Sequence, residues 1–163
     1  RILKVIPKPT FFSERLEDIS MDQVEKYKAI LIDVDNTLLK HHQESISEKK
    51  RKWLSSIRKK KIKIALASNT SKKRAQDLSK ILNLDVFVAY KPFPFSIRNW
   101  IRDNGFETRD VLLIGDQVFT DHLAAIFAKI DSVLVKPMTD RDFIVTRLIS
   151  RRLEKIIYNL WSK

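Results

Sequence analysis

The sequence predicts an α/β fold in which helices cover both faces of a doubly wound, mainly parallel sheet. Hydrophobic runs alternate along the chain with amphipathic segments that carry helix-start signals. The runs are almost continuously apolar, which is typical of strands buried on both faces. The chain has 163 residues, of which 44% are hydrophobic, so it can bury one sizeable core. We therefore expect a single domain over residues 1–163.

Strands and helices are expected to alternate in chain order. We expect strands at residues 28–34, 62–68, 111–115 and 132–136, with a weaker strand at 86–89. Helices are expected between and after them, at residues 49–60, 70 or 71 to 82, 94 or 96 to 103, 120–129, and 139 or 140 to about 161. Right-handed crossovers would place the carboxyl ends of all the strands at one edge of the sheet.

Individual residues predict where some helices begin and end. Ser45 and Glu48 have the spacing of a capping box, which predicts the start of the helix at 49–60. Thr120 is expected to cap the helix that follows it, and Gly105 to stop the helix that ends at residue 103.

The two ends of the chain differ from this alternating pattern. Residues 1–27 contain two prolines and are predicted to form an N-terminal strap with one short helix near 21–26. Residues 139–163 are predicted to form a C-terminal amphipathic helix, whose apolar side is expected to cover the sheet. The alternative is that this side lies in a membrane interface with Trp161 as its anchor.

Composition excludes several classes of site. The chain has no cysteine, so disulfides, cysteine-rich zinc sites and thiolate nucleophiles are absent. Its two glycines are too few for a Walker A loop or a dinucleotide fingerprint. No apolar run is long enough to cross a membrane, and the start is too short and interrupted for a secretory signal. We expect a cytoplasmic protein that associates peripherally with the inner face of the membrane.

Polar residues follow the predicted strands where each strand ends. Asp33 and Asp35 follow the first strand, and Asp116 follows the strand at 111–115. Three carboxylates together suit a hard cation such as Mg²⁺. Ser68 and Lys91, which end or follow two other strands, are groups that bind phosphate oxygens. Carboxylates, a hard cation and phosphate-binding groups at one edge of a sheet indicate phosphoryl transfer.

These residues resemble the four motifs of the haloacid dehalogenase (HAD) superfamily, whose fold is Rossmann-like. The motifs occur in order as Asp33-x-Asp35-x-Thr37, Ser68, Lys91 and Gly115-Asp116-x-x-x-x-Asp121. The retained Asp35 favours hydrolysis over dehalogenation, in which an acid/base has no role.

The resemblance implies a role for each site residue. Asp33 would be the nucleophile that takes up the phosphoryl group, and Asp35 would be the general acid and base. The implied Mg²⁺ ligands are Asp33, the Asp35 carbonyl and Asp116. Ser68, Asn69 and Lys91 would bind the phosphoryl group, supported by Thr37 and Asp121.

The gaps between the motifs are too short for a cap domain, because each holds one helix and little else. An open site suits a phosphate on a macromolecule or a membrane lipid. The chain is similar to the capless YqeG-like phosphatidylglycerophosphatase family (subclass IIIA). The similarity rests on Asp35-Asn36-Thr37-Leu38, Ser68-Asn69 and Gly115-Asp116-Gln117. That resemblance implies phosphatidylglycerophosphate as the phosphorylated substrate.

The formal charge of +12 leaves the partner open. Residues 48–63 hold nine basic side chains and one acid, which fits either a solvated helix face or a patch that binds anionic lipid. One alternative is a phosphatase of a soluble or protein-borne phosphate. Another is a non-enzymatic module that binds nucleic acid or the ribosome, although such a module would need neither Asp33 nor Asp35.

Overall fold

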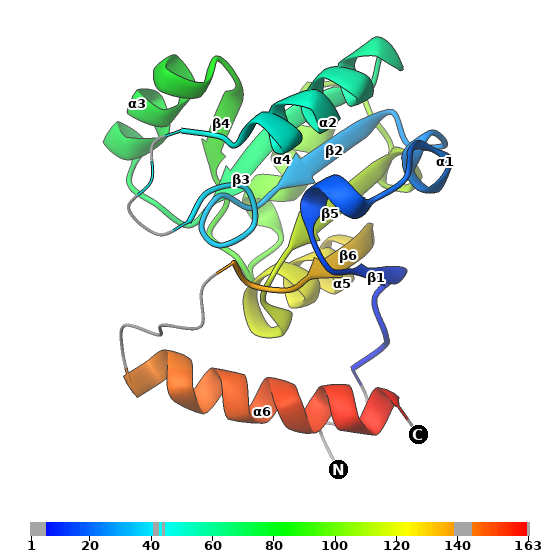
Figure 1. Ribbon diagram of the computed structural model, residues 1–163, viewed down its shortest axis with the longest axis vertical. Coiled ribbons are helices and arrows are strands. Elements are labelled where there is room, and N and C mark those ends of the chain that lie inside the picture. The colour runs from blue at the N-terminus through cyan, green and yellow to red at the C-terminus, as the bar shows by residue number, and fades with distance from the viewer. Residues whose placement is uncertain (1–5, 41–42, 44, 139–144, 163) are drawn as a thin grey trace.

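The computed structural model describes residues 6–40, 43, 45–138 and 145–162, which contain a six-stranded sheet (Figure 1). The strand order is β1-β6-β5-β2-β3-β4, and every pairing is parallel. The strands are β1 (Phe11–Ser13), β2 (Ala29–Ile32), β3 (Lys63–Ser68), β4 (Asp85–Val88), β5 (Val111–Gly115) and β6 (Asp131–Val135). The predicted parallel α/β fold is confirmed.

The described part of the chain also forms six α-helices, which connect or flank these strands. They are α1 (Met21–Val24), α2 (Glu48–Lys59), α3 (Lys72–Leu82), α4 (Phe95–Asp103), α5 (Leu123–Ala128) and α6 (Val145–Trp161). The described residues between β2 and β3 form only α2, and those between β3 and β4 form only α3. Neither connection contains a cap domain, as predicted.

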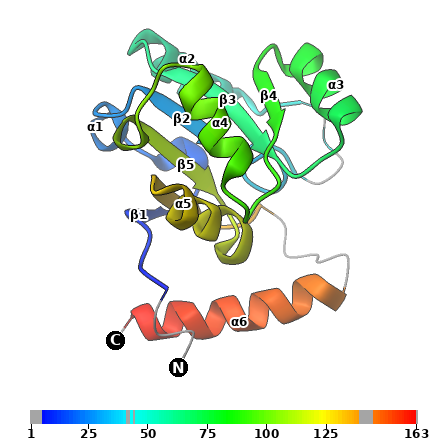
Figure 2. The same cartoon turned by 180° about the vertical axis from the view of Figure 1, so that it is seen from behind.

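Two hydrophobic clusters lie on opposite faces of the sheet. Ile30 and Ile32 of β2 belong to one cluster, and Ala29 and Leu31 belong to the other, because successive strand side chains point to opposite faces. Helices α2 and α3 cover the first face and α4 and α5 cover the second (Figure 2). Since β2 is fully buried on both faces, its sequence is continuously apolar.

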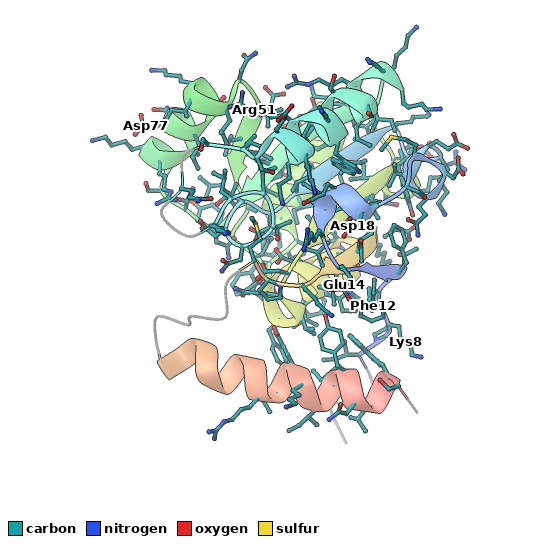
Figure 3. The ribbon with its side chains drawn as sticks, viewed as in Figure 1. Lys8, Phe12, Glu14, Asp18, Arg51 and Asp77 are labelled. Carbon is teal, nitrogen blue, oxygen red and sulfur yellow. The ribbon has the colours of Figure 1, made fainter. Side chains whose placement is uncertain are left out.

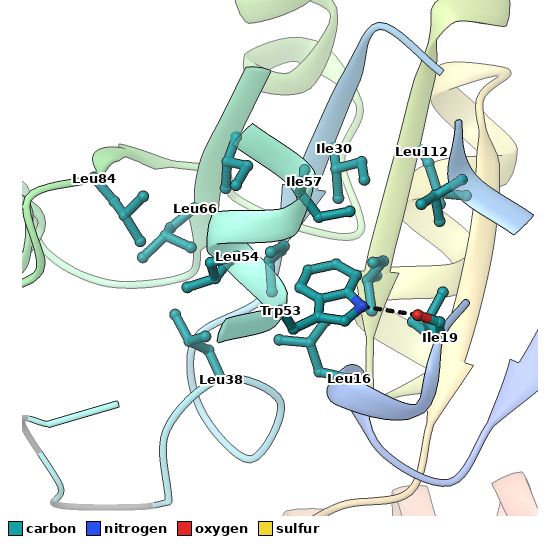
Figure 4. Close-up of a cluster of buried hydrophobic side chains, with 14 of the residues drawn as sticks. Leu16, Ile19, Ile30, Leu38, Trp53, Leu54, Ile57, Leu66, Leu84 and Leu112 are labelled. Atoms are coloured by element: carbon teal, nitrogen blue, oxygen red, sulfur yellow. Dashed lines mark hydrogen bonds between the residues drawn. The ribbon is translucent and has the colours of Figure 1, made fainter. Parts of the chain in front are cut away.

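The strap contributes a strand that the sequence analysis missed. Residues Phe11–Ser13 pair in parallel with β6 and form one edge of the sheet. Three residues are too few to show a periodic pattern, so only the pairing partner reveals the strand. Further along the strap, the Ile19 carbonyl accepts a hydrogen bond of 2.8 Å from Nε1 of Trp53 on α2, which fixes the strap over the first cluster (Figure 4).

Two of the predicted helix starts are wrong. The side chain that caps α2 is Ser47, whose hydroxyl accepts from the amide of Lys50, and not Ser45. Thr120 lies inside a π-helical turn, Val118–His122, that leads directly into α5, so the helical segment begins two residues earlier than predicted. The expected stop is confirmed, because Gly105 follows α4 with a φ of +74°. The predicted start of the last helix at residue 139 or 140 lies outside the described residues.

In the basic segment 48–63, one lysine is neither solvated nor placed to bind lipid. Lys50 is buried, and its Nζ lies 2.8 Å from Oε2 of Glu17 in the strap. The other eight basic side chains of the segment are exposed. Four of them, at residues 58–61, precede the first residue of β3 and therefore lie at the edge opposite the carboxyl ends of the strands.

Helix α6 lies beside the β1 edge and does not cover a face of the sheet (Figures 1 and 2). Ile157 is fully buried with Val118 and Leu134, whereas Leu153 and Ile156 are exposed, so the predicted apolar stripe is only partly covered. On the strap side, Phe12 points toward α6 and its ring centre lies 5.4 Å from that of Tyr158 (Figure 3). Among the described helices, α6 included, none has the length and apolar character needed to cross a membrane.

Candidate active site

The carboxyl ends of four neighbouring strands bring the predicted site residues together. Asp33 follows β2, Ser68 is the last residue of β3, Lys91 lies three residues after β4, and Asp116 follows β5. The strands β4, β3, β2 and β5 are adjacent in that order. Parallel pairing therefore places side chains that are far apart in the sequence at one edge of the sheet.

Lys91 contacts two acidic side chains of the site. Its Nζ lies 2.7 Å from Oδ1 of Asp33 and 2.5 Å from Oδ1 of Asp121. The Lys91 side chain is only 2% exposed. Burial alone would lower the pKa of this ammonium group, but Asp121 and Asp33 outweigh burial and raise its pKa above the ordinary value. Lys91 therefore stays positively charged in the site.

Asp33 has the environment of an unusually basic carboxylate. Burial, reinforced by the negative charge of Asp121, raises the pKa of Asp33 to about 7, although Lys91 opposes the shift. The side chain nevertheless remains 14% exposed. A further cation at this edge would favour the ionised form of Asp33.

The turn after β2 brings Asp35 close to the start of α3. Asn36 has a φ of 63°, a left-handed conformation that asparagine adopts more readily than most residues. The Asp35 side chain is 33% exposed, and its Oδ1 lies 3.6 Å from Nη2 of Arg74 in the first turns of α3. The sequence analysis did not predict that Arg74 lies beside Asp35. The only sequence feature that could have indicated this contact is a basic residue near the start of the helix that follows Ser68.

Asn69 fixes the backbone of the lysine. Its Oδ1 accepts a 2.7 Å hydrogen bond from the Lys91 amide, and its Nδ2 donates a 2.6 Å bond to the Lys91 carbonyl. The side-chain amide of Asn69 therefore connects the loop after β3 to the loop after β4. Ser68 is buried beside it, with 2% of its surface exposed.

The segment after β5 holds the other two carboxylates. Oγ1 of Thr37 donates a 3.4 Å hydrogen bond to Oδ1 of Asp116, and the Gln117 amide donates a 3.1 Å bond to Oδ2 of Asp121. Asp121 packs so closely on Gly115 that a Cβ there would lie 2.2 Å from the Asp121 carboxyl carbon. Only glycine fits at position 115.

The carboxylates have the arrangement expected for a cation site. Within the described part of the chain, one ligand oxygen from each of Asp33, Asp116 and Asp121 lies within 4.8 Å of the others. All three donors are oxygens, which suits Mg²⁺. Both oxygens of Asp121 accept hydrogen bonds, one from Nζ of Lys91 and the other from the Gln117 amide, so Asp121 is the least suited of the three to bind the ion directly. The sequence analysis predicted that Asp121 supports the site, and the structure places it beside both this carboxylate set and Lys91.

Two of the cavities that border the site differ in character. One has a volume of about 560 Å³, lies between α6 and the β1–β6 edge, and is lined by Asp116 together with Phe12, Leu134 and Tyr158. The other, of about 350 Å³, is lined by Asn69, Tyr90, Lys91 and Phe93. Tyr90, Phe93 and Phe95 are all more than half exposed, so apolar side chains flank Lys91 at the surface.

Comparisons with known proteins agree with this geometry. The Bacillus subtilis (strain 168) protein named "Probable phosphatase YqeG" is 26% identical over 159 residues, which cover 96% of this chain and 92% of that protein.

Among solved structures, a HAD-superfamily hydrolase from Geobacter sulfurreducens is 14% identical with a TM-score of 0.55, over 70% of this chain and 89% of that one. A second structure is the N-terminal part of a Bacteroides fragilis protein, which contains a phosphatase domain and is complexed with Mg. It is 18% identical with a TM-score of 0.52, and the match covers 81% of this chain and 42% of that one. At these identities the two structures support the fold alone. The profile of the haloacid dehalogenase-like hydrolases matches residues 30–147, the span that holds all four strand-end motifs, and the chain belongs to that family.

Proposed function

We propose that this protein is a phosphomonoester hydrolase that works through an aspartyl-phosphate on Asp33. The observation that carries the proposal is the 2.7 Å contact between Nζ of Lys91 and Oδ1 of Asp33 at the carboxyl edge of the sheet. A buried ammonium group beside a carboxylate can balance the charge of a phosphoryl group that bonds to that carboxylate. The name of the Bacillus subtilis relative supports the same reaction class.

In the first step, a carboxylate oxygen of Asp33 attacks phosphorus and the bond from phosphorus to the ester oxygen breaks. Protonated Asp35 gives its proton to that oxygen, so the alcohol leaves neutral. Asp35 is suited to this role because it is partly exposed and lies close enough to Asp33 for the charges of the two groups to interact.

In the second step, Asp35, now ionised, takes a proton from water while the water oxygen attacks phosphorus. The bond between Asp33 and phosphorus breaks, which releases inorganic phosphate and restores both carboxyl groups to their starting states. Throughout both steps, Lys91 faces the phosphoryl oxygens, with Ser68 beside it.

The carboxylates also fit Mg²⁺, since their oxygens converge within 4.8 Å. Asp33 and Asp116 would hold the ion together with the Asp35 carbonyl. When bound, the ion offsets the repulsion between these carboxylates and a dianionic phosphate. Thr37 fixes Asp116 for this purpose through its 3.4 Å hydrogen bond.

As the substrate we propose phosphatidylglycerophosphate presented by an anionic membrane. The site has no cap domain over it, so a lipid head group can reach Asp33 while its acyl chains stay in the bilayer. Exposed Phe93 and Phe95 flank Lys91, and the apolar cavity of about 560 Å³ begins at Asp116. Both features support a substrate that carries apolar groups close to its phosphate.

The test is phosphate release from a panel that includes this lipid in anionic vesicles and several soluble phosphomonoesters. We expect Mg²⁺-dependent release that is fastest with the lipid and is abolished by EDTA. The Asp33→Asn variant should remain folded and lose essentially all turnover, because an amide cannot attack phosphorus. The Asp35→Asn variant should be slowed by about 10² to 10⁴-fold.

Different outcomes would reject different parts of the proposal. Full activity of Asp33→Asn would refute the covalent mechanism. Activity that survives chelation would refute the Mg²⁺ assignment. Faster turnover of a soluble ester or a phosphoprotein would refute the lipid substrate and leave the hydrolase proposal intact.

A further inference from the structure

Helix α6 places a buried carboxylate against the segment that follows β5. Glu154 is only 7% exposed, and its Oε1 accepts a 2.9 Å hydrogen bond from the amide of Val118. Val118 is two residues after Asp116 and three before Asp121. Glu154 lies beyond residues 30–147, the part of the chain that the family profile matches.

The Val118 amide is a group that needs a partner from outside its own helix. Val118 is the first residue of the continuous helical segment that the π-helical turn and α5 form. Backbone amides at the start of a helix have no hydrogen-bond acceptor within that helix. Val118 is fully buried, so water cannot replace that partner. Glu154 supplies it with a charge-assisted bond, which is stronger than a neutral one.

The same short segment fixes the acidic side of the candidate site. Its preceding amide, from Gln117, donates to Oδ2 of Asp121, and the other oxygen of Asp121 lies 2.5 Å from Nζ of Lys91. Two consecutive amides are thus held by two carboxylates, one from within the segment and one from α6. A shift of Val118 would move Asp116 and Asp121 relative to Lys91.

We propose that Glu154 is a positioning residue for the active site, and that docking of α6 holds the 116–121 segment in the geometry that binds Mg²⁺ and orients Lys91. This inference rests on the proposed function, because it assigns Glu154 a role in the same reaction. Packing of Ile157 against Val118 and Leu134 supports the docking, but it cannot hold the Val118 amide. The hydrogen bond is what makes the role specific to Glu154.

Two substitutions at Glu154 separate this role from simple anchoring of the helix. Glu154→Ala removes the acceptor, whereas Glu154→Gln keeps a side-chain oxygen that can still accept from Val118. The matched control is Trp161→Phe, which removes another hydrogen bond of α6, the 3.0 Å bond from Nε1 of Trp161 to the Ile6 carbonyl. That bond ties α6 to the strap and does not involve an amide of the 116–121 segment, and phenylalanine keeps an aromatic ring beside His122.

The experiment measures Mg²⁺ binding by calorimetry, the amide resonance of Val118 by NMR, and steady-state phosphate release, each in the full chain. For Glu154→Ala we expect Mg²⁺ affinity and kcat to fall by about tenfold each, the usual effect of removing a group that orients metal ligands, with little change in KM. The Val118 amide proton should move upfield as it loses its charged acceptor. Glu154→Gln should restore most of the affinity and kcat, and Trp161→Phe should match the wild type in both.

The inference is overturned if Glu154→Ala binds Mg²⁺ as the wild type does. It is also overturned if Trp161→Phe, at an equal loss of thermal stability, weakens Mg²⁺ binding and kcat as much as Glu154→Ala does. Calorimetry and NMR need no substrate, so they test Glu154 even where the wild type releases no phosphate. Absence of phosphate release would count against the proposed function and not against the role of Glu154.

Discussion

At the scale of single residues, the site depends on one buried positive charge. Nζ of Lys91 lies within hydrogen-bonding distance of both Asp33 and Asp121. Without it, two buried carboxylates would face each other unscreened, and one would take up a proton. Asn69 holds the Lys91 backbone on both its amide and its carbonyl, so the charge is fixed in position.

Replacing Lys91 by methionine should therefore impair catalysis strongly. We expect Lys91→Met to lower kcat/KM by about 10² to 10³-fold, because a preorganised positive charge at the phosphoryl group is lost. The measurement is steady-state phosphate release, with folding checked by circular dichroism. Lys80→Met, at an exposed position of α3, is the control and should behave as the wild type. Wild-type kcat/KM in Lys91→Met would contradict the assignment of this lysine.

At the scale of elements, a histidine connects the strap to β6 of the sheet. Nε2 of His122 lies 2.6 Å from the Pro7 carbonyl, and Nδ1 lies 2.8 Å from Oγ of Ser132 on β6. A carbonyl can only accept, so Nε2 carries the proton and Nδ1 accepts from the serine hydroxyl. Both partners are satisfied by the neutral ring. Burial lowers the pKa of His122 below its ordinary value of 6.5, although the Pro7 carbonyl opposes the shift.

This contact predicts a pH dependence of stability with a definite sign. The folded pKa lies below the unfolded one, so the contribution of His122 is complete above about pH 6.5. As the pH falls below that value, the unfolded chain takes up the proton first and the contribution is lost. We expect urea unfolding to show that the free energy of unfolding of the wild type, relative to that of His122→Asn, is lower at about pH 5.5 than at about pH 7.5. The comparison is needed because Asp33, whose folded pKa is raised to about 7, contributes with the opposite sign in both proteins. An equal change in both proteins would contradict the role of His122.

At the scale of the whole molecule, a basic surface and an apolar surface lie at opposite ends of the strands. The basic cluster at residues 58–61 lies at the edge opposite the site, because it leads into the start of β3. Exposed Tyr90, Phe93 and Phe95 lie instead beside Lys91. A membrane that presents a phosphorylated head group to Asp33 would meet these aromatic side chains and not the 58–61 cluster.

The aromatic side chains should consequently control vesicle binding. We expect the protein to co-sediment with anionic vesicles, because its formal charge of +12 attracts it to an anionic surface. Binding should weaken as salt is raised and should be much weaker with neutral vesicles. The double variant Phe93→Ala/Phe95→Ala should bind at least about tenfold more weakly, because membrane affinity scales with the apolar area that is buried. Phe127→Ala is the matched control, since Phe127 is also exposed but lies near the end of α5, which precedes the start of β6. Equal binding of both variants would contradict an orientation with the site facing the membrane.

Much of the fold and of the candidate site could be predicted from local patterns in the chain. The strand at Val111–Gly115 was predicted to the residue, because a run of apolar residues buried on both faces has a clear sequence signature. The gathering of Asp33, Lys91 and Asp116 at one edge followed from their places after parallel strands. In contrast, the strand Phe11–Ser13 forms by pairing with β6, and Arg74 lies beside Asp35. Both contacts join residues that are far apart in the sequence, so no local pattern reveals them.

The parallel sheet, the order of its elements and the chemical types of the groups at the carboxyl ends of its strands could be predicted from the amino-acid sequence, because they follow from periodicity and from residue spacing along one strand or helix. Other features appear only in the folded chain: Lys91 contacts both Asp33 and Asp121, Lys50 is buried against Glu17, and Glu154 accepts a hydrogen bond from Val118. Each of these is a contact between a charged side chain and a partner at least 30 residues away. Such a contact forms only when packing removes water from both groups, and so it depends on where the whole chain places them.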